Sequence, residues 1–339
     1  MSHTSSASFP LVSRSLSTQD IQVVCQPLVK RIKHSEAVYT HLSQDSRKVS
    51  SSGVFIAVRG TKVDGHTFIS ALARIPNLLI IGEESPDSYP EVYNYMQVAN
   101  TREIVGPLAQ AFAGDPWQRL QVIGITGTNG KTTTATLLYE LLSRSGKAVS
   151  LLGTVSKRIL DEEIPSSLTT SDPIELANDM QAMVNAGSTH LVMEVSSHAL
   201  DQYRVQGIPF TIAIFTNITH DHLDYHKTHL SYIKSKCKLL DMTNKSIYLN
   251  MDCKSTDKVL SLTSSNAKIM LYTEHYNITA KHKTKMLDTT TNKYNYSVIY
   301  ALLKKMNISD SKIIKIFEKI RPIAGRNNII FKKGFARFI

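Results

Sequence analysis

The feature that most constrains the fold is a glycine-rich loop between an apolar strand and a helical segment, QVIGITGTNGKTTT at residues 121–134. Its glycines stand at positions 124, 127 and 130, just before Lys131 and Thr132. In this setting backbone N–H groups and the helix dipole face phosphates, and a lysine reaches the outer ones. We therefore predict a phosphate-binding loop, with Lys131 at the β- and γ-phosphates and Thr132 at Mg²⁺. A strict Walker sequence would have glycine in place of Ile125, and the alternative is a tight strand–helix turn that binds nothing.

The segments around this loop alternate between apolar strands and amphipathic helices. Strands are predicted at 121–126, 148–155, 190–195 and 210–216, and a helix at 134–146 ends at a glycine. Such alternation is typical of a parallel sheet with helices on both faces. The predicted fold class is α/β, with a P-loop-type parallel sheet in the central domain.

The chain of 339 residues is long enough for two domains with separate cores. Residues 20–117 contain their own strand and helix signals, and Asp115-Pro116 marks a boundary because the residue before proline is disfavoured in helices. Residues 1–19 are rich in serine and hold no acid, so we predict a disordered tail, with an organelle transit peptide as the alternative. A central domain at 118–325 and a linker at 326–339 complete the predicted division.

Composition argues against several classes of protein. No apolar run approaches the ~20 residues needed to span a bilayer, so no membrane partner is predicted. The cysteines form no CxxC pair, which argues against a zinc ribbon and favours a reducing cytoplasm. The formal net charge of +11 is concentrated after residue 225. Because no RGG tract or aromatic-basic RNA signature accompanies it, a biased codon composition or a polyanionic small substrate is preferred to nucleic acid.

Several separated motifs resemble those of one enzyme family. GITGTNGKTTT is similar to the ATP loop of the Mur ligases, and within that family the MurE type matches best. Folylpolyglutamate synthases share the fold but typically have Gly-Lys-Gly-Ser where this chain has Gly-Lys-Thr-Thr. The further motifs are DSR at 45–47, DGHTF at 64–68, TT at 169–170, MEVSSHALDQYR at 193–204 and TNITHDHLDYH at 216–226.

The resemblance implies a cytoplasmic, monomeric ligase of peptidoglycan precursor synthesis that uses ATP and Mg²⁺. Its reaction would add a third amino acid, meso-diaminopimelate or else lysine, to UDP-MurNAc-L-Ala-D-Glu through an acyl phosphate. The implied architecture is a small N-terminal α/β UDP-binding domain, an ATP-binding central domain and a Rossmann-like third domain. Two alternatives stay open: a non-catalytic remnant that binds UDP-sugar or nucleotide, and a folylpolyglutamate synthase-like ligase.

The resemblance also carries functional residues onto this chain. A second Mg²⁺ is implied at Glu194, His222 and Lys236, with the lysine carbamoylated by CO₂ so that anionic oxygens face the metal. With Lys131, these three form the implied catalytic set. ATP would be bound by Gly127, Thr128, Asn129, Gly130, Lys131, Thr132, Thr133 and Asn295. The substrate would be held by Ser46, Thr169, Thr170, Ser196, Gln202 and Arg204, with a turn serine and a surface ion pair as alternatives for Ser46 and Arg204.

The histidines between residues 220 and 229 raise the alternative of a zinc site. Zinc would need ligands on one helical face, at spacings such as i and i+4. His222 and His226 have that spacing, but Leu223-Asp224-Tyr225 between them is predicted to be a loop. Only His222 is therefore assigned to a metal, and His220, His226 and His229 are predicted to be solvated or locally hydrogen-bonded.

Two departures from the family pattern affect these predictions. A short lysine-rich interval with KHKTK at 281–285 replaces extra strands, and Val298 replaces a second asparagine, which weakens the adenine contact implied for Asn295. IRPIAGRNNIIF at 320–331 resembles the linker to the third domain, yet the chain ends at Ile339. Because that domain would orient the incoming amine and exclude water, we expect this chain to bind the UDP-dipeptide, to bind ATP weakly if at all and to form no tripeptide by itself.

Overall fold

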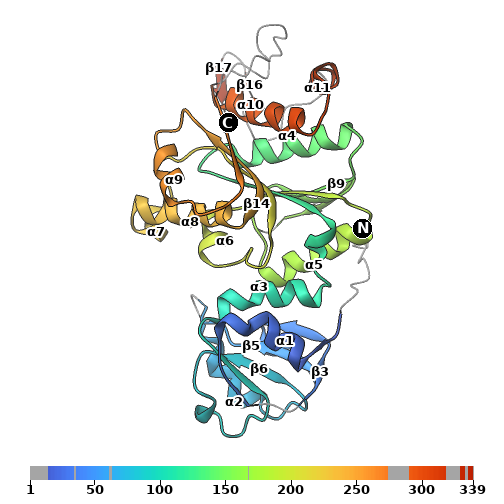
Figure 1. The fold of residues 1–339 in the computed structure, drawn as a ribbon, viewed down its shortest axis with the longest axis vertical. Coiled ribbons are helices and arrows are strands. Elements are labelled where there is room, and N and C mark those ends of the chain that lie inside the picture. The colour runs from blue at the N-terminus through green and yellow to red at the C-terminus, as the bar shows by residue number, and fades with distance from the viewer. Residues whose placement is uncertain are drawn as a thin grey trace. The chain divides into compact units, whose positions relative to one another are not determined.

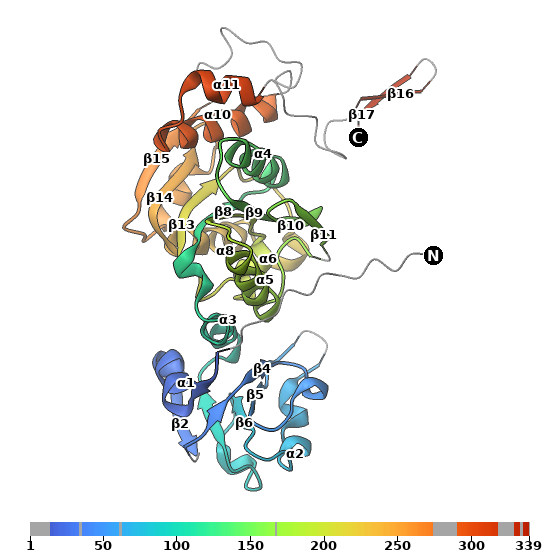
Figure 2. The ribbon, with the colours of Figure 1, turned by 90° about the vertical axis from the view of Figure 1, so that its right-hand side faces the viewer.

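The computed structural model describes residues 14–33, 36–60, 63–166, 168–273, 290–317, 329–332 and 335–338. The chain divides into two compact units (Figures 1 and 2). The first holds residues 1–119, 171–185 and 201–208, and the second holds the rest. Residues 171–185 join the first unit because α5 (Pro173–Asn185) packs Ala177 against Ala109 and Ala113, in and just after α3 (Thr101–Phe112).

The first unit contains a sheet of order β2-β7-β6-β5-β4, in which β4 to β7 are parallel and β2 is an antiparallel edge. Val54 and Ile56 belong to the core covered by α1 and α3, whereas Phe55 belongs to the opposite core under α2. Both faces are therefore buried, as parallel strands require. The elements are β1 Leu16–Ser17, α1 Thr18–Cys25, β2 Val29–Lys33, β3 Val38–Tyr39, β4 His41–Ser43, the 3₁₀ turn η2 Ser46–Lys48, β5 Gly53–Ile56, α2 Ile69–Leu72, β6 Leu79–Gly82 and β7 Tyr95–Val98.

The second unit contains a sheet of order β11-β10-β9-β12-β8-β13-β14-β15. Strands β9, β12, β8, β13, β14 and β15 are parallel to one another, whereas β10 and β11 pair antiparallel. This arrangement confirms the α/β prediction. The strands are β8 Gln121–Thr126, β9 Val149–Leu152, β10 Ser156–Ile159, β11 Glu162–Pro165, β12 His190–Glu194, β13 Phe210–Phe215, β14 Thr243–Asn250 and β15 Lys268–Tyr272. The helices are α4 Lys131–Arg144, α6 Ser197–Asp201, α7 Leu223–His226, α8 His229–Asp241, α9 Thr256–Leu262, α10 Thr290–Lys305 and α11 Asp310–Phe317.

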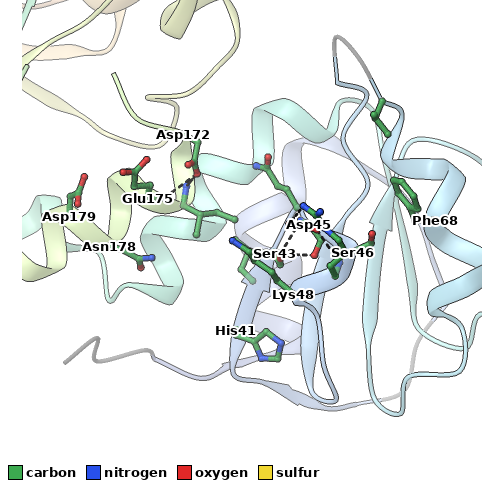
Figure 3. A pocket seen from close by; sticks show the side chains of 15 residues that line it. His41, Ser43, Asp45, Ser46, Lys48, Phe68, Asp172, Glu175, Asn178 and Asp179 are labelled. Carbon is green, nitrogen blue, oxygen red and sulfur yellow. Dashed lines mark hydrogen bonds and ion pairs between the residues drawn. The ribbon is translucent and has the colours of Figure 1, made fainter. Parts of the chain in front are cut away.

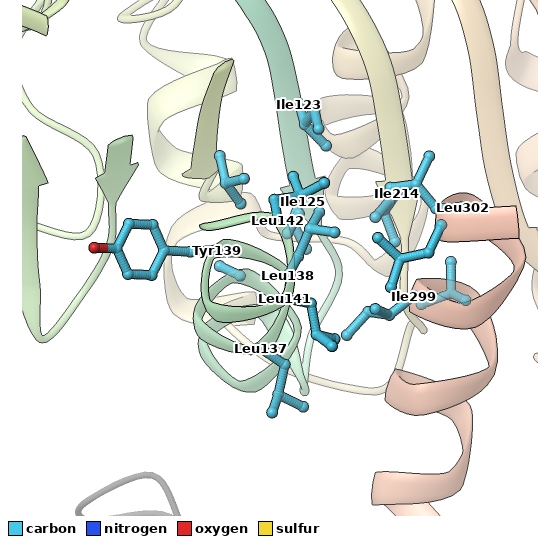
Figure 4. Close-up of a cluster of buried hydrophobic side chains, with 14 of the residues drawn as sticks. Ile123, Ile125, Leu137, Leu138, Tyr139, Leu141, Leu142, Ile214, Ile299 and Leu302 are labelled. Atoms are coloured by element: carbon cyan, nitrogen blue, oxygen red, sulfur yellow. The ribbon is translucent and has the colours of Figure 1, made fainter. Parts of the chain in front are cut away.

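Helices cover both faces of this second sheet. Ile123 and Ile125 of β8 lie in the apolar cluster beneath α4 and α10 (Figure 4). Gly124 lies toward α8, since a Cβ there would be 2.7 Å from the Phe210 ring and 2.9 Å from Leu239. Because β8, β12 and β13 are parallel neighbours, the loops at their carboxyl ends meet at one edge, where ligands bind in such sheets.

The structure corrects the prediction of a disordered tail at residues 14–19. Leu16–Ser17 form β1 and Thr18 begins α1. Ser17 caps this helix, because its hydroxyl accepts from Asp20 N at 3.1 Å and the Asp20 carboxylate accepts from Ser17 N at 2.9 Å. Residues 1–13 of the predicted tail lie outside the described residues.

Other predictions also change. The predicted loop at Leu223-Asp224-Tyr225 is wrong, because these residues form most of α7. The β10–β11 hairpin was not predicted. KHKTK at 281–285 lies outside the described residues, and within the predicted linker at 326–339 the described part forms β16 (Ile329–Lys332) and β17 (Phe335–Phe338). Within the described ranges no helix has the length and apolar character needed to cross a membrane.

Candidate active site

The glycine loop leaves β8 and enters α4 at Lys131. Gly127 has φ +142° and Gly130 has φ +86°, a region that side-chain-bearing residues rarely adopt. A Cβ on Gly127 would collide with the Thr216 hydroxyl, and one on Gly130 would lie 2.6 Å from Asn295 Oδ1. The loop is therefore packed closely on both sides, and only glycine fits these two positions.

Two lysines converge on one carbonyl oxygen of the loop. Lys131 Nζ donates to Gly127 O at 2.9 Å and to Thr128 O at 2.8 Å, and Lys236 Nζ donates to the same Gly127 O at 2.8 Å. Lys236 is only 1% exposed. Burial lowers the pKa of Lys236 well below its ordinary value, and the charge of Lys131 lowers it further against the opposing effect of Asp221.

This depressed pKa predicts a pH dependence of stability. The unfolded chain binds a proton on Lys236 up to its ordinary pKa of 10.5, whereas the folded chain binds that proton more weakly. We therefore expect the free energy of unfolding to rise as pH approaches this value from below, by up to about 1.4 kcal/mol per pH unit from this group. Urea unfolding at several pH values is expected to show a shallower slope for Lys236→Met than for the wild type. Equal slopes would contradict the prediction.

Glu194, at the end of β12, is 1% exposed and approaches the start of α4. Its Oε2 accepts from Thr132 Oγ1 at 2.8 Å and from Thr154 Oγ1 at 3.2 Å, and its Oε1 accepts from Thr154 N at 2.8 Å. A carboxylate beside a hydroxyl offers the oxygen ligands that Mg²⁺ prefers, and such ions take phosphates and waters in their other positions. These residues therefore fit Mg²⁺. In the described part of the chain no group of three or more His, Cys, Asp or Glu side chains could hold a metal by itself.

The histidine stretch lies on and around α7. His222 precedes the helix with φ +50°, and its Nε2 is 3.4 Å from Asp221 Oδ2. Its ring centroid is 4.8 Å from that of His198. His226 is buried, and its Nε2 lies 3.0 Å from Ser197 Oγ, so it is not solvated and this bond does not join it to a neighbour in the sequence. Among the described residues, no hydrogen bond or ion pair joins His222 to the other implied metal ligands.

Asn295, on α10, lies directly behind the glycine loop. It is 2% exposed, and its Oδ1 accepts from Thr134 Oγ1 at 3.1 Å. Its Nδ2 is buried without a hydrogen-bond partner among the described residues. An unpaired buried donor beside a phosphate-binding loop fits a nucleotide as its acceptor.

The implied substrate residues are divided between the two units. In the second unit Thr170 Oγ1 donates to Glu194 O at 3.0 Å and accepts from Ser196 N at 3.2 Å. Thr169 Oγ1 lies 3.2 Å from Thr154 Oγ1. The structure therefore brings Thr169, Thr170 and Ser196 next to the implied metal ligand Glu194.

Ser46, Gln202 and Arg204 belong to the first unit. Arg204 donates to Gln202 Oε1 through Nε at 3.0 Å and Nη2 at 2.6 Å. Ser46 begins η2, which Asp45 caps by accepting from Arg47 N at 3.1 Å. It also lines a cavity of about 1100 Å³ that lies between η2 and the first turns of α5 (Figure 3).

Three residues that build the loop environment were missed by sequence reasoning. Asn217 accepts from Asn129 N at 3.0 Å and donates to Asn129 O at 3.1 Å, which fixes the loop. Asn217 follows β13 closely, so the rule that strand ends meet at one edge could have found it. Thr154 and Tyr232 carry no comparable signal, although Tyr232 OH lies 3.1 Å from Thr128 Oγ1.

Comparison with known proteins agrees with this geometry. The Mur ligase middle domain model matches residues 125–329, and the Mur ligase family catalytic domain model matches residues 38–113. The UDP-N-acetylmuramoyl-L-alanyl-D-glutamate–2,6-diaminopimelate ligase of Parabacteroides distasonis is 34% identical over 307 residues, which cover 85% of this chain and 63% of that protein. The Bacteroides fragilis enzyme of the same name is 35% identical over 334 residues, which cover 92% and 68%.

A solved structure of a ligase of the same name superposes with a TM-score of 0.75 at 24% identity and covers 94% of this chain and 69% of that one. That likeness supports the fold. The chain thus spans about two thirds of the length of these relatives. With both domain models matched in order and the glycine loop built as described, the chain belongs to the Mur ligase family.

Proposed function

We propose that this protein is an ATP- and Mg²⁺-dependent ligase that joins diaminopimelate to UDP-MurNAc-L-Ala-D-Glu. The curated relatives carry that activity in their names. The observation that carries the proposal is that Lys131 and Lys236 both donate to Gly127 O. This oxygen belongs to the glycine loop, which continues into Thr132 and its hydrogen bond to Glu194. In this arrangement Lys131 would supply the positive charge that a reaction between a carboxylate and a triphosphate needs, and Lys236 would supply an amine that can form a carbamate.

In the proposed reaction an oxygen of the substrate carboxylate displaces ADP from the γ-phosphorus, and the amine then displaces phosphate from the acyl phosphate. Lys131 would offset the negative charge of the outer phosphates, and the loop would hold them through backbone N–H groups. Bound Mg²⁺ supplies charge neutralisation between the two anions. Thr132 and Glu194 would hold it, and Thr169, Thr170 and Ser196 would place the dipeptide nearby, with Ser46, Gln202 and Arg204 serving the UDP and muramoyl parts.

The proposal includes a carbamate on Lys236. The neutral amine nitrogen attacks the carbon of CO₂, a C–N bond forms as one C=O π bond opens, and a proton leaves the nitrogen for solvent. Burial and the Lys131 charge favour the neutral amine that this step requires. His222 would complete that metal site together with Glu194. We further propose that the enzyme is monomeric and cytoplasmic, with no nucleic-acid partner.

The direct test is calorimetry of the chain with two ligands, UDP-MurNAc-L-Ala-D-Glu and Mg²⁺ with a non-hydrolysable ATP analogue. Both are expected to bind, each with one site per chain. UDP-N-acetylglucosamine is the matched control for the dipeptide and is expected to bind more weakly. A chain that binds neither the dipeptide nor the nucleotide would rule out the proposed function.

The substitutions Lys131→Ala and Thr132→Ala distinguish the nucleotide-binding site from the UDP-dipeptide-binding site. Each substitution is expected to weaken binding of the Mg²⁺–ATP analogue by at least ~10-fold, because a charge-assisted contact to phosphate or a metal ligand is lost. UDP-dipeptide affinity is expected to stay within about twofold, since Ser46 and its cavity belong to the other unit. Calorimetry of both ligands measures this. Joint loss of both affinities would indicate misfolding and contradict the assignment of these residues to ATP.

A further inference from the structure

Tyr232 occupies a central position between the glycine loop and Lys236. It lies on α8 one turn before Lys236, and residues four apart share a helix face. Its side chain is fully buried, with 0% exposure. Its ring centroid is 4.6 Å from Lys236 Nζ and 5.2 Å from the centroid of the His226 ring.

The phenol end of the same side chain is attached to the loop. Tyr232 OH lies 3.1 Å from Thr128 Oγ1, and that hydroxyl also accepts from Thr219 N at 3.0 Å. Burial raises the pKa of Tyr232 to about 12, although its hydrogen bond with Thr128 acts in the opposite direction. The phenol is therefore neutral near pH 7, and it keeps both a donor and an acceptor for Thr128.

The hydrogen bond from Lys236 Nζ to Gly127 O is not sufficient to fix the position of the lysine side chain. The same carbonyl oxygen also accepts from Lys131. Phosphate binding by Lys131 would alter the interactions of that oxygen. The Tyr232 contacts do not depend on the Lys131 side chain: the phenol binds the loop through Thr128, and the ring supports the lysine from one side.

We propose that Tyr232 is a positioning residue that links the glycine loop to Lys236, so that nucleotide binding at the loop and carbamate formation on the lysine favour each other. This inference rests on the proposed function, because it takes Lys236 as the site of the carbamate. Such coupling is reciprocal: saturating bicarbonate must tighten nucleotide binding by the same factor by which bound nucleotide raises the equilibrium constant for carbamate formation.

Calorimetry with and without bicarbonate tests the link on the intact chain. In the wild type, bicarbonate is expected to tighten binding of the Mg²⁺–ATP analogue by at least about fivefold. The response is expected to fall below about twofold in Tyr232→Phe, which removes only the hydroxyl, and in Thr128→Val, which cuts the same bond from the other side. The double variant should lose no more than either single variant. Lys236→Met should show no response.

Tyr139→Phe is the matched control. It removes another buried phenol of the same unit, whose OH donates to Leu160 O at 2.7 Å, and it is expected to keep the wild-type response. A wild-type response in Tyr232→Phe would overturn the inference and leave the proposed function standing. Absence of any bicarbonate response in the wild type would also overturn it, while binding of the analogue reports separately on the proposed function.

A second readout needs no nucleotide. Carbon-13 bicarbonate NMR detects the carbamate on Lys236 directly, with Lys236→Met as the blank. Tyr232→Leu removes the ring that supports the lysine and is expected to lower this signal at least ~threefold at a fixed bicarbonate concentration. If the wild-type chain binds neither the UDP-dipeptide nor the nucleotide, the proposed function fails, whereas an unchanged carbamate signal in Tyr232→Leu would independently overturn the role of Tyr232.

Discussion

Replacing Lys236 by alanine is expected to abolish tripeptide formation in a ligase of the relatives' full length that contains this chain. The expected loss is roughly 10²–10³-fold or more, the size seen when a group that stabilises developing charge is removed. Lys236 Nζ lies 2.8 Å from Gly127 O, so a carbamate there would place anionic oxygens beside the loop. Acetate or formate is expected to restore part of the rate, because a short carboxylate can supply such oxygens in the space left by the side chain.

Lys234→Ala is the control for this prediction. Lys234 lies on the same helix, two residues away, but its side chain is exposed. It is expected to keep the wild-type rate and to show no response to added carboxylate. Tripeptide formation is measured with radiolabelled UDP-dipeptide. Unchanged turnover in Lys236→Ala would remove the carbamate from the mechanism.

The fold was predicted well where the local pattern carries it. Strands such as QVIGIT and HLVMEV are buried on both faces, so they appear in the sequence as continuous apolar runs that alternate with helices. The β10–β11 hairpin carries no such signal, since β11 is mostly exposed and the turn contains Leu160 at φ +52° where glycine or asparagine would be expected. The single turn of α7 is likewise too short to show a helical period.

The site was predicted less completely, because its contacts join distant parts of the chain. The loop itself is local, and its glycine spacing is sufficient to assign Lys131 to phosphate. The contact between Lys236 and Gly127 spans 109 positions and depends on strand order, which one sequence does not reveal without a resemblance. The role of Tyr232 was not predicted for the same reason. In the sequence, an aromatic residue at helical spacing is indistinguishable from an ordinary core residue, and only the fold brings Tyr232 against Thr128.

Glu194 allows the structural and metal-binding roles of one carboxylate to be separated. Glu194→Ala leaves the buried Thr132 hydroxyl without its acceptor, and we expect the free energy of unfolding to fall by roughly 1–3 kcal/mol. Glu194→Gln keeps an oxygen that can accept from Thr154 N. Its amide N–H groups can donate to the two threonine hydroxyls, which are able to reverse their roles. The glutamine variant should therefore stay within about 1 kcal/mol of the wild type.

Both substitutions are expected to weaken Mg²⁺-dependent nucleotide binding by at least ~10-fold, because a neutral amide or a methyl group cannot replace an anionic oxygen ligand of Mg²⁺. Urea unfolding measures the first effect, and calorimetry of the ATP analogue across a series of Mg²⁺ concentrations measures the second. The informative result is a glutamine variant that is as stable as the wild type but has lost its response to Mg²⁺. If Glu194→Gln instead responds to Mg²⁺ like the wild type, then Glu194 serves only to hold Thr132 and Thr154, and the metal must be bound by other oxygens.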